Sequence, residues 1–140
     1  EEKGYAVLSR EWKEGDTAEL ELPMECRRVY PNPRVYNLAN QVAVARGPLV
    51  YCAEEVDDGE LLSRVMIPEK AELKEHYEPD LLEGVYTVTV EAVRLSLEQE
   101  ELYTSKQPKL EPVTLKLIPY LLWANRTTGE MRVFFQEQRD

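Results

Sequence analysis

The stretch VYTVTVEAVRL, residues 85–95, decides the fold class, because it is the strongest strand signal in the chain. It is rich in valine and threonine, whose β-branched side chains are favoured on a pleated strand. The residues before it, EPDLLEG at 78–84, carry the proline, aspartate and glycine typical of a turn. We therefore predict that a turn at 78–84 leads into a β-strand at 85–95.

Short segments with strand character lie on both sides of this stretch and are separated by turn signals. In TAELELP, for example, alanine and leucine alternate with threonine and glutamate, as expected for a half-buried strand. Turn chemistry in EGD, residues 14–16, predicts that this strand pairs with 5–12 as a hairpin. The other predicted strand regions are 26–30, 61–68, 71–78, 113–125 and 131–138. Residues 41–54 suit either two short strands or one long strand bent at 46–48, and we favour the bent strand.

Two segments have less certain or non-strand character. Residues 68–77 suit either a short helix or a strand, and the absence of a helical apolar stripe favours the strand. Residues 96–112 are polar, acidic and bounded by prolines, which predicts a long excursion over the surface. Nine to ten short strands without a convincing amphipathic helix indicate an all-β fold, which we expect to be a jelly-roll-like antiparallel β-sandwich forming one domain over 1–140.

Charge and composition narrow the classes of partner. The chain has 27 acidic and 17 basic residues, and its net charge of -10 disfavours nucleic acids and anionic membranes. No apolar run approaches the ~20 residues of a membrane helix. The two cysteines, Cys26 and Cys52, are too few for a disulfide framework or a zinc site. We expect both to be free thiols, which favours a reducing compartment.

Residues that could carry chemistry all have a simpler structural explanation. Cys52 is followed by Glu54 and Glu55, and nearby carboxylates raise a thiol pKa, so a buried thiol is favoured over a nucleophile. The same two glutamates point to opposite faces of a strand, which favours solvated charges over a glycosidase acid pair. The acidic run at 57–60 is explained by a turn better than by a calcium loop.

Aromatic residues are the remaining candidates, because flat rings can stack on sugars. Trp12, Tyr36 and Trp123 are the candidates for carbohydrate binding. In IPYLLWAN, Tyr120 and Trp123 fall on opposite faces of the predicted strand, and both faces have the apolar character of buried surface. We therefore favour core or interface packing over a sugar-binding platform as the role of Tyr120, Leu121 and Trp123.

Three stretches, taken in order, resemble one family. They are GYAVLSREWKEGDTAELELPM at 4–24, QVAVARGPLVYCAE at 41–54 and IPYLLWANRTTGEMRVF at 118–134, and EPDLLEGV at 78–85 fits between the last two. Together they are similar to the C-terminal β-sandwich region of glycoside hydrolase family 127, the bacterial β-L-arabinofuranosidase-like proteins. The resemblance covers nearly the whole chain.

The resemblance implies that catalysis lies elsewhere. In that family an upstream α/α barrel carries a cysteine nucleophile held by zinc, with glutamate and further cysteines that include an adjacent pair. This chain has no adjacent cysteines, so no catalytic residue is carried over to it, and zinc is expected only in the catalytic domain. The implied role is a non-catalytic accessory domain that packs on its own barrel and contributes to pairing with a second subunit. The alternative is a carbohydrate-binding module.

Overall fold

The computed structural model describes residues 3–98 and 100–139, and its regular structure begins only at Cys26. Within the described residues nine strands form one continuous sheet. The strands are β1 (Cys26–Val29), β2 (Gln41–Arg46), β3 (Leu49–Glu54), β4 (Val65–Pro68), β5 (Lys74–Glu78), β6 (Val85–Leu95), β7 (Leu110–Pro119), β8 (Met131–Arg132) and β9 (Phe135–Gln138). Helical segments are short and connect strands: η1 (Tyr36–Leu38), α1 (Glu55–Asp58), η2 (Leu62–Arg64) and η3 (Tyr120–Leu122).

Six of these strands close into a barrel, so the predicted β-sandwich is wrong. The hydrogen-bonded order runs β2, β9, β4, β6, β7, β3, and β3 returns to β2 through the pairs Ala45 with Val50 and Arg46 with Leu49. β1, β5 and β8 attach outside this ring to β2, β6 and β3. Alternation along a strand indicates which side chains face inward, but a sandwich and a barrel share that pattern. What distinguishes them is that β2 pairs both with β3, across a tight turn, and with β9, far along the chain.

The barrel interior is the hydrophobic core. β6 and β7 form its longest pair, from Val88 opposite Leu117 to Leu95 opposite Leu110. The largest fully buried side chains converge there from all six barrel strands and η2, and they include Tyr51, Leu62, Ile67, Leu117 and Phe135. β6 has 11 residues and coincides with the strand predicted at 85–95, which confirms that prediction, and β7 has 10 residues.

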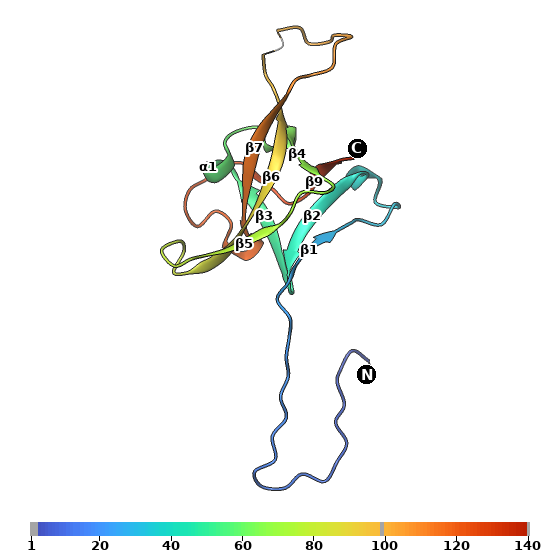
Figure 1. The fold of residues 1–140 in the computed structure, drawn as a ribbon, viewed down its shortest axis with the longest axis vertical. Coiled ribbons are helices and arrows are strands. Elements are labelled where there is room, and N and C mark those ends of the chain that lie inside the picture. The colour runs from blue at the N-terminus through green and yellow to red at the C-terminus, as the bar shows by residue number, and fades with distance from the viewer. Residues whose placement is uncertain (1–2, 99, 140) are drawn as a thin grey trace.

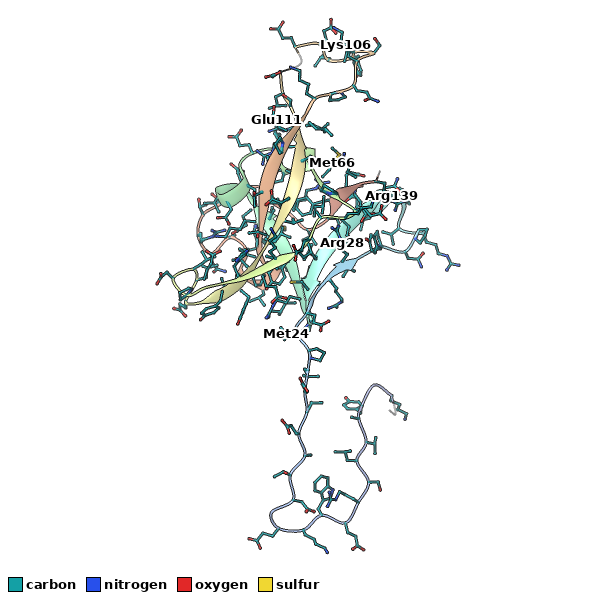
Figure 2. All side chains as sticks on the ribbon, viewed as in Figure 1. Met24, Arg28, Met66, Lys106, Glu111 and Arg139 are labelled. Carbon is teal, nitrogen blue, oxygen red and sulfur yellow. The ribbon has the colours of Figure 1, made fainter. Side chains whose placement is uncertain are left out.

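Two segments project from opposite ends of the barrel (Figure 1). Residues 3–25, which we call the tail, leave the barrel as an extended chain without strands, and Figure 2 places Met24 at the point of departure. The predicted 5–12 and 17–22 hairpin is therefore wrong for this chain. The 96–109 loop between β6 and β7 forms the other projection, with Lys106 near its tip, as expected for a surface excursion.

Local predictions elsewhere had mixed outcomes. The expected bent strand at 41–54 is two strands, because Gly47, at a φ of +53°, and Pro48 form a tight turn between β2 and β3. Residues 74–78 are the strand β5, which confirms the preference for a strand in that part of 68–77. The strand predicted at 113–125 stops at Pro119 and continues as η3. Among the described residues, no helix is long and apolar enough to cross a membrane.

Candidate functional site

The candidate site is the loop that follows β7, because it presents apolar side chains outward from a rigid base. We call this loop, residues 120–126, the aromatic loop. Within it Tyr120, Leu121 and Trp123 are 45%, 64% and 42% exposed. The Tyr120 and Trp123 rings stack with centroids 6.1 Å apart and an angle of 19° between their planes. The sequence interpretation made these residues core or interface residues; their exposure shows that they do not belong to the core of this domain, and an interface role stays a prediction. The strand ends at Pro119, so the alternation on which the interpretation rested does not continue.

The backbone of the aromatic loop is fixed by local hydrogen bonds. The Trp123 N–H donates to the Tyr120 carbonyl at 3.1 Å, and the Asn125 side-chain amide donates to the Leu122 carbonyl at 2.9 Å. Ala124 adopts a φ of +60°, a left-handed conformation that L-residues other than glycine, asparagine and aspartate seldom adopt. These contacts turn the chain away from the direction of β7.

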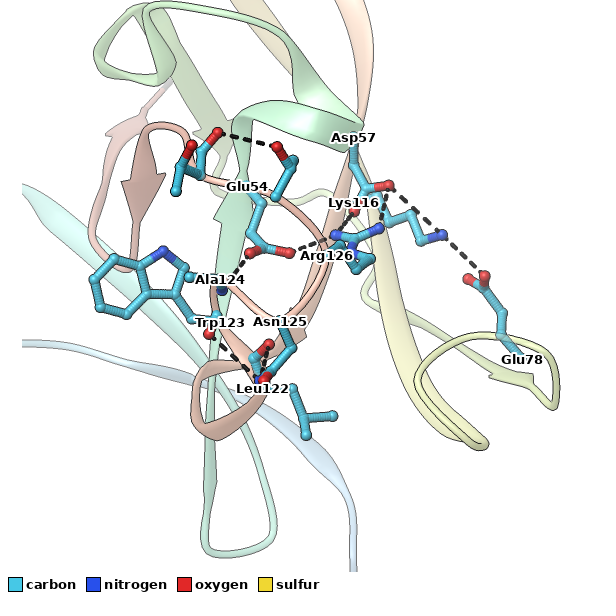
Figure 3. Close-up of polar contacts among 11 residues, drawn as sticks. Glu54, Asp57, Glu78, Lys116, Leu122, Trp123, Ala124, Asn125 and Arg126 are labelled. Carbon is cyan, nitrogen blue, oxygen red and sulfur yellow. Dashed lines mark hydrogen bonds and ion pairs between the residues drawn. The ribbon is translucent and has the colours of Figure 1, made fainter.

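A buried group of charged side chains anchors this loop to the barrel (Figure 3). The Arg126 guanidinium donates to both carboxylate oxygens of Asp57, at 2.9 and 2.5 Å, and to Glu54 Oε2 at 2.5 Å. Glu54 Oε1 accepts the Ala124 backbone N–H at 2.8 Å. We call Glu54, Asp57 and Arg126 the anchor cluster. It joins the end of β3, α1 and the aromatic loop.

The electrostatics of the anchor cluster favour its charged form. Hydrogen bonding to Asp57, and then to Glu54, raises the pKa of Arg126 above its ordinary value despite the opposing effect of burial. Bidentate arginine–carboxylate pairs are among the stronger hydrogen-bonded ion pairs. Lys116 extends the network, with its Nζ 2.9 Å from Glu78 Oε2 and 3.9 Å from Asp57 Oδ1. The loop is thus held by ionic contacts to the end of β3 and to α1, and Lys116 links α1 in turn to β7 and β5.

Asp58, next to the anchor cluster, is buried in a different way. Its Oδ1 accepts the Lys116 backbone N–H at 2.9 Å, whereas its Oδ2 is buried without a hydrogen-bond partner. Burial raises the pKa of the Asp58 carboxyl to about 7, although the Lys116 N–H and the nearby Arg94 and Lys116 charges oppose the rise. Asp58 therefore ties α1 to β7, and it does so at the cost of holding a carboxylate in an apolar environment.

The sequence analysis missed the anchor cluster. It treated Glu54 as a solvated charge, yet Glu54 is only 4% exposed, and it treated 57–60 as an exposed acidic turn. One signal was available: Glu54 directly ends a run of three buried apolar residues, 51–53. Nothing in the sequence pairs it with Arg126, which lies 72 positions away.

The predicted sugar-binding residues are not brought together. Trp12 lies on the tail with the Arg10 guanidinium 5.0 Å above its ring, Tyr36 lies in η1, and Trp123 lies in the aromatic loop. Within 3–98 and 100–139 the only contact with another aromatic ring that any of the three makes is that of Trp123 with Tyr120. Whether any of them binds sugar stays a prediction.

The two thiols do not have the properties of nucleophiles. Burial, followed by the charge of Glu54, raises the pKa of Cys52 to about 12. Burial and the neighbouring Glu75 raise that of Cys26 to about 12 as well. Both cysteines are free. Among the described residues no three His, Cys, Asp or Glu side chains gather as a metal site, so the residues present do not fit the zinc centre that the family resemblance implies for the catalytic domain.

Comparisons with known proteins agree on one family. The model of the glycoside hydrolase family 127 C-terminal domain matches residues 26–136. The non-reducing end β-L-arabinofuranosidase of Bifidobacterium longum subsp. longum is 46% identical over 129 residues, which cover 86% of this chain and 20% of that enzyme.

Solved structures give the same result. A family 127 β-L-arabinofuranosidase from Geobacillus stearothermophilus T6 superposes with a TM-score of 0.80 at 43% identity, over 83% of this chain and 19% of that one. Another solved family 127 β-arabinofuranosidase has a TM-score of 0.73 at 34% identity, over 82% of this chain and 17% of its own. The chain therefore spans about a fifth of the length of the relatives it matches.

Proposed function

The chain belongs to glycoside hydrolase family 127, as the C-terminal domain of that family, and from this premise we propose that it is a non-catalytic accessory domain that docks on the catalytic part of an arabinofuranosidase. The observation that carries the proposal is the aromatic loop. It exposes three adjacent large apolar side chains, and yet it is fixed by a buried charged cluster. A rigid apolar projection loses little conformational entropy on binding, which suits a permanent contact surface.

The state of the two cysteines supports a non-catalytic role. Nucleophilic cysteines need a lowered pKa, and in both Cys26 and Cys52 the pKa is raised to about 12. An isolated chain that catalysed hydrolysis would release the aryl group from aryl arabinofuranosides. We expect no turnover above the buffer blank, and measurable turnover would contradict this part of the proposal.

Docking is tested by charging the aromatic loop in the full-length protein. We expect Leu121→Asp to uncouple thermal unfolding of this domain from that of the catalytic part, so that one transition becomes two in calorimetry. Leu102→Asp in the 96–109 loop is the matched control, since Leu102 is 91% exposed. In the isolated chain both variants should unfold like the unmodified protein. Identical calorimetric traces for both full-length variants would contradict docking through the aromatic loop.

The gene itself gives a simpler first test. An open reading frame continuing upstream of the codon for Glu1 into a helical domain with an adjacent pair of cysteines would place the chemistry there. A start codon directly before Glu1 would remove the docking proposal.

The same surface predicts association of the isolated chain. Without a catalytic part to cover it, the aromatic loop leaves apolar area in water, and such surfaces promote self-association. Sedimentation equilibrium should show dimers or larger species at high concentration, and Leu121→Asp should shift them towards monomer. A strict monomer before and after the substitution would count against pairing through this loop.

Carbohydrate binding is the second candidate, favoured by the stacked and half-exposed rings of Tyr120 and Trp123. The chain has two tryptophans, so the test uses a Trp12→Phe background in which only Trp123 fluoresces. Saturable quenching by L-arabinose or arabino-oligosaccharides would favour a binding module. A flat titration would leave docking as the function of the loop.

A further inference from the structure

The tail, residues 3–25, exposes apolar side chains that the barrel does not cover. Its exposed large apolar residues are Tyr5, Val7, Leu8, Trp12, Leu20 and Leu22. The C-terminal arm of the tail, 17–22, also has a sided pattern: Leu20 and Leu22 share one face with Ala18, and glutamates occupy the other. This is the pattern of a strand that buries one face, in a segment that buries neither.

The tail nevertheless already contains a formed turn. The Asp16 N–H donates to the Lys13 carbonyl at 3.0 Å, and Asp16 Oδ2 accepts from the Lys13 N–H and from Arg10 Nη2, both at 2.9 Å. Gly15 has a φ of +90°, which L side chains rarely adopt. The chain reverses direction here, so the N-terminal arm of the tail, 5–12, runs in the opposite direction to the C-terminal arm, 17–22 (Figure 1). The turn of a hairpin is thus present without its sheet.

The two arms lack a partner layer, which explains why they stay unpaired. A two-stranded hairpin is marginal in water by itself and needs a third strand or an apolar layer to be stable. The barrel does not provide one, since the tail is exposed throughout 3–15 and 17–23, and only Asp16 between them is half-buried. Contact with the barrel begins at Met24, whose side chain packs tightly on Gly47.

We propose that the tail is a β-arm that closes into a hairpin and adds to the open edge of a β-sheet in the part of the full-length protein that lies outside this domain. Ala18, Leu20 and Leu22 would face the core of that sheet, and Glu19 and Glu21 would face solvent. Adding a strand to a sheet edge supplies both the backbone hydrogen bonds and the apolar cover that the arms lack.

The sheet that accepts the tail is assigned to the same polypeptide because of where the tail lies relative to the family's domain. The C-terminal domain model matches 26–136 and leaves the tail outside it. The curated relative carries about four fifths of its length outside the matched part, so a large region is available to provide the sheet. This inference rests on family membership and not on docking through the aromatic loop.

Amide hydrogen exchange tests the proposal in the full-length protein and in this chain alone. In the full-length protein we expect amides within 5–12 and 17–22 to exchange at least about 100-fold more slowly than in the isolated chain, because ladder hydrogen bonds protect them. Equal and fast exchange in both would overturn the proposal and make the tail a linker. Slow exchange already in the isolated chain would also overturn it, since the hairpin would then need no partner.

Variants on the two faces sharpen the test. In the full-length protein, Leu20→Glu with Leu22→Glu should return 5–12 and 17–22 to fast exchange. Glu19→Gln with Glu21→Gln, on the opposite face, should leave them protected. Amides of β6 provide the folding control and should stay protected throughout. If both pairs of substitutions leave the tail equally protected, the assigned face is wrong and the proposal fails.

The Leu121→Asp variant separates this inference from the proposed function. It should uncouple domain unfolding while leaving tail protection unchanged. Loss of tail protection in that variant would show that the arm depends on docking of the aromatic loop, and would overturn the independence claimed here.

Discussion

β6 and the C-terminal arm of the tail share an alternation of apolar and polar residues, but only β6 forms a strand. Both alternate apolar and polar residues, VTVEA at 88–92 and AELEL at 18–22. In β6, Val88 and Val90 are fully buried, with β5 on one side and β7 on the other. In the tail, Leu20 and Leu22 are 76% and 70% exposed and no strand forms. Alternation therefore encodes the capacity to pair, and a strand forms only where a partner layer is available.

The largest expected effect comes from removing the same side chain in the two regions. Leu117→Ala in β7 removes a side chain that is 1% exposed, and we expect the free energy of unfolding to fall by up to about 5 kcal/mol, from lost burial and the cavity left behind. Leu20→Ala in the tail should change it by less than about 0.5 kcal/mol. Urea denaturation of both variants measures the contrast. Equal losses would show that the tail packs on the barrel in solution.

The pH dependence of stability gives the next largest contrast. Burial raises the pKa of Asp58 in the folded state to about 7, so between pH 4 and 7 the folded protein binds more protons than the unfolded chain, and stability from this group falls as pH rises. A shift of this size corresponds to at most roughly 4 kcal/mol. Asp58→Asn removes the titration. Its stability relative to the unmodified protein should therefore rise by up to that amount from pH 4 to pH 8.

Denaturation curves at both pH values measure this difference, and any pH-independent cost of the new amide cancels from it. A flat difference for Asp58→Asn would mean that the carboxyl is solvated.

Ion pairs should also differ between the two regions. Arg126→Ala would leave the buried Glu54 carboxylate without its ion-pair partner and Asp57 with only the longer contact to Lys116, and we expect a loss of about 3 kcal/mol. Arg10→Ala breaks the Arg10–Asp16 pair, in which the arginine side chain is 52% exposed, and should cost less than about 1 kcal/mol. Thermal unfolding with near-ultraviolet circular dichroism would follow both stability and the Trp123 environment. Comparable small losses would indicate that the anchor cluster is solvated.

The smallest expected effect is that of removing the tail. A chain beginning at Met24, which keeps the contact of Met24 with Gly47, should keep the barrel's midpoint in urea within experimental error, because the strands and the core lie within 26–138. If the truncated chain lost several kcal/mol of stability, the tail would have to contact the barrel.

The sequence indicated most strands of the barrel but not their closure. The β-branched run at 85–95 and the apolar run at 49–54 form strands as expected, since their neighbours in the chain fold back beside them. The strand predicted at 113–125 ended early at Pro119, and the tail hairpin did not form. In both cases the sequence alternates like a strand, but no neighbouring strand or apolar layer of the described structure pairs with that segment.

The candidate site was only half predictable. Tyr120, Leu121 and Trp123 stood out as an apolar and aromatic cluster, and the family resemblance to glycoside hydrolase family 127 is confirmed by the comparisons. Their exposure was not predicted, because it follows from the chain leaving β7 at Pro119. The anchor cluster was missed altogether, since Glu54, Asp57 and Arg126 are brought together only by the packing of α1 and the aromatic loop on the end of β3.

By itself, the sequence determined the β-rich character, the family, and the residues able to line a core, because alternation and β-branched composition act over a few neighbouring residues. The tertiary structure alone decided that the sheet closes into a six-stranded barrel, that Glu54 is buried against Arg126, and that the tail remains unpaired. Those outcomes depend on contacts between residues far apart in the chain, and burial of an apolar face or a charge is favourable only when such a partner is present.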